Sequence, residues 1–267
     1  MKRSVVMKKR TDILLLMPSL AGFAVFFIIP FVYTFYYAFT ENAFTGKFAG
    51  LNNFVMLFGN RYFRLAMKNT LRFTALSVPL TMALSLLIAL AIAKFAARIP
   101  LVKSAFFLPV ILPSAAIIML WNAYFADFSP FSSMLLIFLW KYGGLNVMLM
   151  LTALSGVQGD MLDAAKIDGA GSIGTLFHVI IPNIAPTLFF TFILSIVNSF
   201  KIFRESYLLY GGYPDESVYM LQNYLNNHFM KLNYQNISTA AIFFAVVVYT
   251  AVAVVFALEK KWSDSVW

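Results

Sequence analysis

The sequence contains no cysteine and only two histidines, His178 and His228, which lie far apart along the chain. A disulfide framework and a thiolate metal site are therefore excluded. A zinc site without cysteine would need carboxylates clustered beside one of the histidines, and the sequence has no such cluster. We expect no metal ion and no cofactor on this chain.

Charge is also scarce, since only 12% of the residues are charged whereas 61% are hydrophobic, and the mean hydropathy is +0.80. A soluble domain has about 25% charged residues. The composition therefore predicts a polytopic membrane protein. The net charge of +9 does not indicate nucleic acid binding, because the basic residues are spread over short segments. It fits basic cytoplasmic loops beside anionic membrane lipid.

Several catalytic signatures are missing. The chain has no GxxxxGK[ST] phosphate loop, no HExxH and no GxSxG, so we do not expect an ATPase, a metalloprotease or a serine hydrolase. Within the apolar runs, Lys141 is the one ionisable residue predicted near the middle of the membrane. A proton relay of Asp, Glu or His is therefore not indicated.

What the sequence does have is long apolar runs. They predict an all-α polytopic fold with about six transmembrane helices, and the predicted spans are 13–39, 71–93, 104–125, 131–153, 183–204 and 238–258. The basic segment 1–12 and the tail 259–267 are both expected in the cytoplasm. The first run is too long for a signal peptide and no small-residue cleavage site follows it.

Lys141 lies inside the fourth predicted span, where exposing an ammonium group to lipid would cost several kcal/mol. Two interpretations remain open. Lys141 could be a structural partner of a carboxylate or of a helix carbonyl group, or it could line a polar pathway through the membrane.

The loop 155–181 is the one long interruption between apolar runs whose residues suggest a helix, a tight turn and a second helix. It begins with acidic residues, continues through two glycines that allow a sharp turn, and ends in an apolar helical pattern before Pro182. The pattern consists of Asp160, Asp163, Lys166, Asp168, Gly169, Gly171, Ile173, Leu176, Phe177 and Ile180. The pattern alone leaves open whether this loop is a membrane-surface anchor or a docking site for a partner.

The order of these residues resembles the EAA loop of permease subunits from bacterial ATP-binding cassette (ABC) importers. That loop contains Glu-Ala-Ala, three further residues, a glycine and, about nine residues later, I-x-L-P. Here the corresponding residues are Asp163, Ala164, Ala165, Asp168, Gly169, Ala170, Ile180, Ile181 and Pro182. Asp163 replaces the usual glutamate and Ile181 the usual leucine.

The resemblance extends over nearly the whole chain. Residues 50–54 (GLNNF), 69–70 (NT) and 106–109 (FFLP) are similar to segments of carbohydrate importer permeases. Residues 203–214 (FRESYLLYGGYP) resemble the F-x-x-x-Y-x-L-T-G-G-x-P signature, with Tyr210 in place of threonine. This signature is found in the half of the permease heterodimer typified by the first subunit of the maltose and glycerol-phosphate permeases.

The resemblance implies a type I ABC importer permease fold in the bacterial inner membrane. It implies a second, homologous permease subunit, two ATP-binding subunits that bind ATP and Mg²⁺, and an extracytoplasmic sugar-binding protein docking on the external loops 41–70 and 206–237. It also implies that the loop couples the chain to the ATPase. The implied coupling residues are Asp160, Asp163, Ala164, Ala165, Asp168, Gly169, Ala170 and Pro182.

A sugar pathway needs aromatic faces, amides and hydroxyl groups. The candidates near membrane depth are Trp121, Asn122, Trp140, Tyr142, Asn146 and Asn198. Each has a structural alternative, because Trp and Tyr are enriched at membrane interfaces and Asn often forms hydrogen bonds between helices. A secondary transporter or channel that works alone is the alternative function, and a membrane-embedded enzyme ranks behind both.

Overall fold

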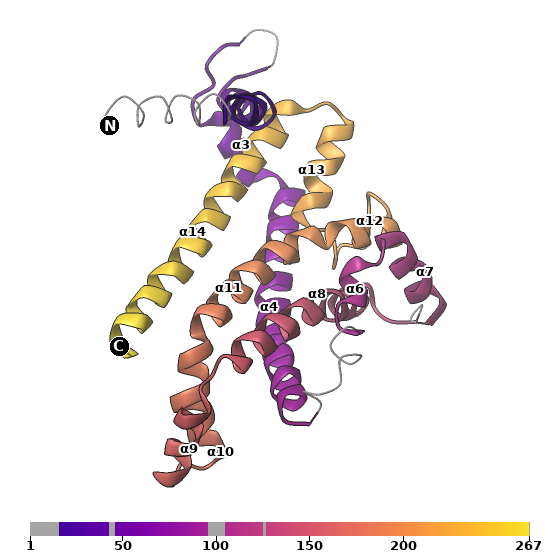
Figure 1. Cartoon of the computed structure of the whole chain (residues 1–267). Coiled ribbons are helices and arrows are strands. Elements are labelled where there is room, and N and C mark those ends of the chain that lie inside the picture. Colours follow the sequence, from indigo (N-terminus) through magenta and orange to yellow (C-terminus); the bar gives the residue numbers. More distant parts are fainter. Residues whose placement is uncertain (1–15, 43–45, 96–104, 125–126, 267) are drawn as a thin grey trace, which may run out of the picture. The chain divides into compact units, whose positions relative to one another are not determined.

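The computed structural model describes residues 16–42, 46–95, 105–124 and 127–266, and it consists of helices joined by short connections (Figure 1). Within these residues five helices are long and apolar enough to cross a membrane, and Ser114–Tyr124 is a shorter apolar helix. The five are Leu16–Ala38, Arg61–Phe95, Pro130–Ser155, Ser172–Tyr210 and Tyr234–Trp262. This confirms an all-α polytopic membrane protein, whereas the predicted basic segment 1–12 lies outside the described residues.

The chain divides into two compact units, and the first comprises the residues up to Arg61 together with Asn227–Val247. The first span of this unit contains the π-helical segment η1 (Ala24–Ile28) and α2 (Ile29–Ala38). The short helix α3 (Asn52–Gly59) follows a turn. The buried Asn53 donates its amide to the carbonyl groups of Ala38 and Thr40, both at 2.9 Å. This side chain therefore fixes α3 to the end of the first span.

The second unit comprises Tyr62–Asn226 and Val248–Trp267. Its interior is formed by α4 (Arg61–Phe95), α8 (Pro130–Ser155) and α11 (Ile181–Lys201), and α8 packs along α11. Helix α8 is apolar on most of its circumference, so it can be buried on several sides. The core around it includes Phe73, Ile117, Ile118, Met134, Ile137, Phe138, Tyr142, Ile202, Val218 and Met220.

The predicted span 104–125 is not one helix in the described residues. Helix α6 (Leu108–Ile111) ends before Leu112, whose ψ of 136° is extended, and α7 (Ser114–Tyr124) begins after Pro113. The pyrrolidine ring explains the break, because a residue that precedes proline is driven out of the helical region. The interruption gives Ser114 the first position of a new helix.

A close backbone contact brings the segment before α6 against α8. A Cβ atom added at Gly144 would collide with the carbonyl oxygen of Phe106. A Cβ at the neighbouring Gly143 would meet Ser85 Oγ at 3.7 Å, which is an ordinary contact. Glycine is therefore required at 144 and not at 143, since small residues let membrane helices and chain segments approach closely.

Two other helices extend beyond their predicted spans. Helix α4 begins at Arg61, ten residues before the predicted start at 71, and α14 (Tyr234–Val266) continues through most of the predicted tail 259–267. The loop 206–237 is also partly helical, because it contains the end of α12 (Phe203–Tyr210) and all of α13 (Leu221–Met230). Hydropathy detects the apolar part of a helix, whereas backbone hydrogen bonds continue past it.

The two adjacent glycines give a matched test of the close contact. Gly144→Ala is expected to destabilise the protein by about 1–3 kcal/mol through overpacking against Phe106. Gly143→Ala is expected to be neutral or to stabilise by up to about 1 kcal/mol, because alanine favours helices. Thermal unfolding of both variants in detergent checks this, and equal melting temperatures would contradict the assigned contact.

Candidate functional site

The loop predicted at 155–181 is a pair of short helices. Helix α9 (Gly159–Ile167) is followed by α10 (Ser172–Thr175), which continues through the π-helical segment η2 (Leu176–Ile180) into α11. We call residues 159–180 the handle. Pro182 occupies the second position of α11 and does not interrupt the helix. Proline is tolerated in the first turn of a helix, where its missing N–H costs little, and here the π turn of η2 comes directly before α11.

The turn inside the handle depends on one glycine. Gly169 has φ = +76°, and Ala170 N–H donates to the carbonyl of Ala165 at 2.9 Å while Gly169 N–H donates to that of Lys166 at 3.1 Å. These bonds form a Schellman motif, in which a residue of positive φ ends the helix. Gly171, which the sequence also offered for the turn, has an ordinary φ of −69°.

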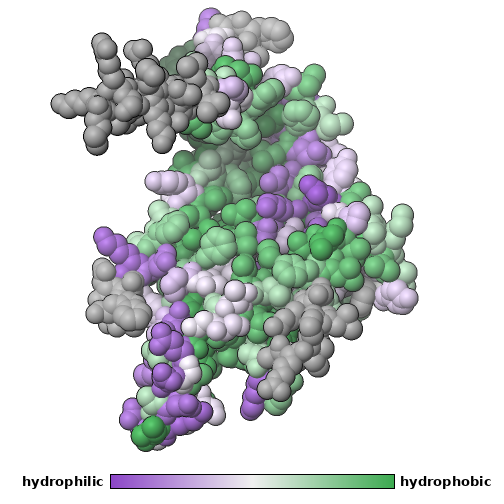
Figure 2. All heavy atoms as spheres, viewed as in Figure 1, coloured by the Kyte–Doolittle hydropathy of each residue, from purple (hydrophilic) through white to green (hydrophobic). Residues whose placement is uncertain are grey.

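The handle combines acidic groups with exposed apolar side chains. Asp160, Asp163 and Asp168 are exposed, and so are the small residues Ala164, Gly169 and Ala170. Ile167, Ile173 and Phe177 are 85%, 74% and 59% exposed. In Figure 2 hydrophilic residues gather over α9 and α10. Apolar side chains that are left exposed among polar ones are typical of a surface that binds a protein partner.

Two charge effects shape the surface of α9. Asp160 lies in the first turn and Lys166 in the last, where each complements the helix dipole. Asp163 forms an ion pair with Lys166 at 2.7 Å, and both side chains are about 70% exposed. An ion pair so exposed to water contributes little to stability, so the carboxylate of Asp163 stays available to another cation. Ala165 is the member of the predicted coupling set that is buried on α9.

A buried ion pair lies in the second unit, away from the handle along α8. Lys141 on α8 pairs with Glu205 on α12, and the two residues are 8% and 0% exposed. Ser114 at the start of α7 donates its hydroxyl to the same carboxylate oxygen, Oε1, at 2.6 Å. Lys141 therefore has a carboxylate partner, and this agrees with the interpretation of Lys141 as a structural residue. Removing one member of such a pair costs about 3–5 kcal/mol.

Glu205 was missed as a site residue because the fifth span was predicted at 183–204, which places Glu205 just beyond the end of the span. Helix α11 instead ends at Lys201, and α12 begins at Phe203 with Glu205 in its first turn. At this position the carboxylate of Glu205 is fully buried. Lys141 was the available signal, since a lysine inside an apolar span requires a carboxylate partner.

The predicted pathway residues do not form one cluster. Trp121 and Trp140 meet edge to face with ring centroids 6.4 Å apart. Asn122 is exposed on α7, whereas Tyr142 and Asn198 are buried on α8 and α11. Asn146 donates to Ser195 Oγ at 2.7 Å, so its amide connects α8 with α11. The interhelical role suggested for asparagine thus applies to Asn146.

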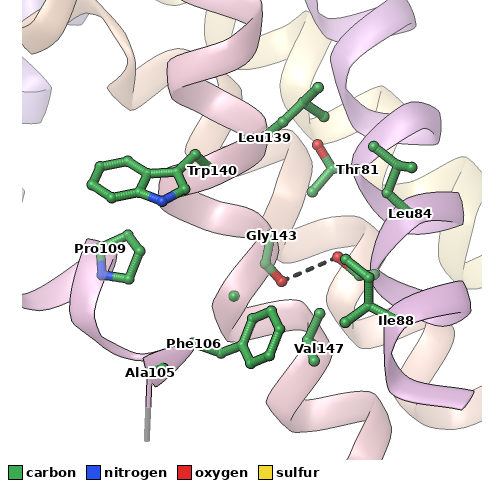
Figure 3. A pocket seen from close by; sticks show the side chains of 12 residues that line it. Thr81, Leu84, Ile88, Ala105, Phe106, Pro109, Leu139, Trp140, Gly143 and Val147 are labelled. Atoms are coloured by element: carbon green, nitrogen blue, oxygen red, sulfur yellow. Dashed lines mark hydrogen bonds between the residues drawn. The ribbon is translucent and has the colours of Figure 1, made fainter. Parts of the chain in front are cut away.

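Trp140 also lines a pocket of about 260 Å³ between α4, α8 and the segment 105–111 (Figure 3). Leu84 and Ile88 stand on the α4 side of this pocket, and Trp140 and Pro109 stand opposite them (Figure 3). Ser85 donates its hydroxyl to the carbonyl of Gly143 at 3.1 Å and joins the two walls. The pocket offers an aromatic edge within mostly apolar walls.

The apolar spans, the polar contacts between them and the exposed handle are together typical of a membrane transport permease. A sequence model of the family "binding-protein-dependent transport system inner membrane component" matches residues 87–264. The chain belongs to this family. It is thus a multi-pass inner-membrane component of a transport system, and its family is one of permeases rather than of catalytic subunits.

Characterised relatives cover most of the chain. The arabinooligosaccharides transport system permease protein AraP of Bacillus subtilis (strain 168) is 26% identical over 286 residues, which cover 97% of this chain and 90% of that protein. The sn-glycerol-3-phosphate transport system permease protein UgpA of Yersinia pestis is 28% identical over 212 residues, covering 70% and 72%.

Solved structures show the same fold. The crystal structure of a bacterial ABC transporter that imports the acidic polysaccharide alginate contains a chain with a TM-score of 0.79 at 20% identity, covering 97% of this chain and 98% of that one. A second structure, with the same TM-score, shows the alginate transporter with an alginate pentasaccharide-bound periplasmic protein. The predicted type I ABC importer permease fold is confirmed.

The Asn146–Ser195 contact yields a test of whether Asn146 is structural. Among the described residues, Ser195→Ala leaves the buried amide nitrogen of Asn146 with Met82 Sδ at 3.9 Å as its one remaining partner, so it is expected to destabilise the protein by about 1–3 kcal/mol. The double variant Asn146→Leu/Ser195→Ala removes both polar groups and is expected to be closer to the wild type. Thermal unfolding in detergent measures both. A double variant less stable than Ser195→Ala would contradict this role.

Proposed function

We propose that the chain is the permease subunit of an ATP-driven importer that moves a sugar or oligosaccharide from an external binding protein into the cytoplasm. The observation that carries the proposal is the handle, an exposed helix pair inserted between α8 and α11 and turned by Gly169. The names of the relatives support the substrate class, since they include permeases for arabinooligosaccharides, lactose and starch degradation products.

The handle is suited to a cleft on a separate ATPase. Asp160, Asp163 and Asp168 can accept hydrogen bonds from basic groups of that partner, and charge-assisted bonds of this kind are the strong ones. Ala164 and Ala170 allow close approach because their side chains are short. The exposed Ile167 and Ile173 supply apolar area. Burying each of them would contribute roughly 1.5–3 kcal/mol before the entropy of ordering is counted.

The complete importer would contain four membrane-associated subunits. This chain would pair with a second, homologous permease, and each permease would bind one ATPase subunit, which holds ATP and Mg²⁺. Both termini of the chain would lie in the cytoplasm, on the side of the handle. The external binding protein would dock on the loops at the opposite ends of the spans.

Alternating access follows from this arrangement. When the ATPase subunits close on ATP, the two handles would be drawn together and the attached spans would open outward. Among the six pathway candidates, Trp140 has the best geometry, because its indole edge lines the pocket in Figure 3 and contacts Trp121. An aromatic ring can stack on the apolar face of a sugar.

Gly169 and Gly171 provide a matched test of the handle. Gly169→Val is expected to reduce ATPase binding and uptake strongly, because valine at φ = +76° is strained by about 1 kcal/mol or more and turns the helices away from their docking angle. Gly171→Val should retain both, since its φ of −69° and ψ of 171° suit valine. No heavy atom lies within 4 Å of a Cβ built at either site, so backbone strain alone separates them.

The measurement needs the ATPase subunit, the second permease and the binding protein of the proposed importer. We would compare co-purification of the ATPase subunit and ATP-dependent uptake of labelled arabinooligosaccharide and lactose into proteoliposomes containing the binding protein. Wild-type behaviour of Gly169→Val would refute the docking role. Uptake by this chain alone, without ATP or binding protein, would indicate a stand-alone transporter or channel.

A further inference from the structure

The handle is carried by two arms, and both belong to the second unit. Helix α8 leads into α9 at one end of the handle, and α11 continues from η2 at the other. Lys141 lies about 20 Å along α8 from Ser155, at a rise of 1.5 Å per residue. Glu205 follows the far end of α11, on α12. The Lys141–Glu205 contact therefore joins the two arms at the ends that are distant from the handle.

This contact closes a ring. The covalent chain runs from α8 through the handle and α11 to α12, and the ion pair returns from α12 to α8. Between these two ends, Asn146 on α8 donates to Ser195 on α11 at 2.7 Å. The arms are thus connected at the handle, near the middle and at the far end.

We propose that the Lys141–Glu205 ion pair is a positioning contact that makes α8, α11 and α12 move as one body when the handle is displaced. The inference rests on the proposed function, because it concerns how displacement of the handle reaches the far ends of the spans. Without the pair, α8 and α12 could move apart when the handle is displaced. Part of the displacement would then not reach the far ends of the spans.

The details of the pair favour this role over simple burial of two charges. Both residues are nearly inaccessible, so the attraction between them is only weakly screened by water. Glu205 Oε1 accepts from Lys141 and from Ser114, whereas Oε2 has no hydrogen-bond partner among the described residues. In the part of the chain that the structure describes, Lys141 and Ser114 are therefore the two residues that form hydrogen bonds with this carboxylate. Because Ser114 begins α7, the start of α7 is drawn into the same body.

Stability alone does not account for the pair, since well-packed apolar residues of similar volume are often as stabilising as a buried ion pair. The variant Lys141→Met/Glu205→Gln removes both charges and the ionic attraction while it keeps similar side-chain volumes. The exchange variant Lys141→Glu/Glu205→Lys restores opposite charges in reversed order. Comparing the two variants distinguishes a loss of folding from a loss of the movement that α8, α11 and α12 transmit.

The experiment measures transport per ATP hydrolysed in the assembled importer, reconstituted with its ATPase, second permease and binding protein. We expect Lys141→Met/Glu205→Gln to assemble and to hydrolyse ATP, while substrate molecules imported per ATP fall by about fivefold or more, as loss of a coupling contact predicts. The exchange variant should recover part of this ratio. Thr74→Val removes the 2.8 Å hydrogen bond between Thr74 on α4 and Ser199 on α11. This bond joins α4 to the ring but does not close the ring, so its loss should leave the ratio within about twofold.

A distance measurement tests the same proposal without transport. Because the chain has no cysteine, spin labels can be attached to Thr152→Cys and Leu208→Cys, both exposed, on α8 and α12. In the assembled importer with wild-type Lys141 and Glu205, this distance should be the same with and without ATP. In Lys141→Met/Glu205→Gln it should broaden or change with ATP.

The outcomes are distinguishable. A double variant with the wild-type ratio and an unchanged distance would overturn the positioning role and leave the handle as the docking element. Failure of the double variant to assemble, with the exchange variant assembled but still uncoupled, would also overturn it. Failure of the wild-type chain to bind any ATPase would instead refute the proposed function.

Discussion

Inside a membrane a charged side chain must have a partner, and this constraint governs the second unit. Lys141 on α8 needs a carboxylate, and Glu205 in the first turn of α12, just after the break that follows α11, supplies it. The proline-induced break in the third predicted span then places Ser114 where its hydroxyl reaches the same oxygen. Two departures from regular helix thus satisfy one buried charge.

Polar side chains at the point where the apolar part of α4 begins perform a related task for the loops. Asn69 on α4 donates to the carbonyl groups of Glu216 and Tyr219 at 2.6 and 3.0 Å, and Thr70 Oγ1 accepts from the N–H of Leu221 at 2.9 Å. The segment that follows α12 is therefore tied to α4 by two adjacent residues. Since buried backbone groups need partners, these contacts explain why an Asn-Thr pair opens the apolar part of that helix.

The sequence was sufficient to predict what depends on local chemistry. Apolar length predicted the membrane spans, and the turn at Gly169 followed from the absence of a Cβ atom. The sequence was not sufficient to predict features that depend on tertiary contacts. The predicted span 104–125 includes Pro113, where the structure shows a break, and neither hydropathy nor periodicity could show that Glu205 is buried. The requirement for glycine at 144 was not predicted, because it arises from the close approach of Phe106, which lies far away in the sequence.

The π-helical segment η2 has a geometric consequence for the junction between α10 and α11. Its bond from Ile181 N–H to the carbonyl of Leu176 spans five residues instead of four. One additional residue advances the helical phase by about 100°. The number of residues in η2 therefore determines the direction in which α10 faces around the axis of α11. Removing a single residue from η2 would rotate α9 and α10 about the axis of α11, and Asp160, Asp163, Ile167 and Ile173 would then face a different direction.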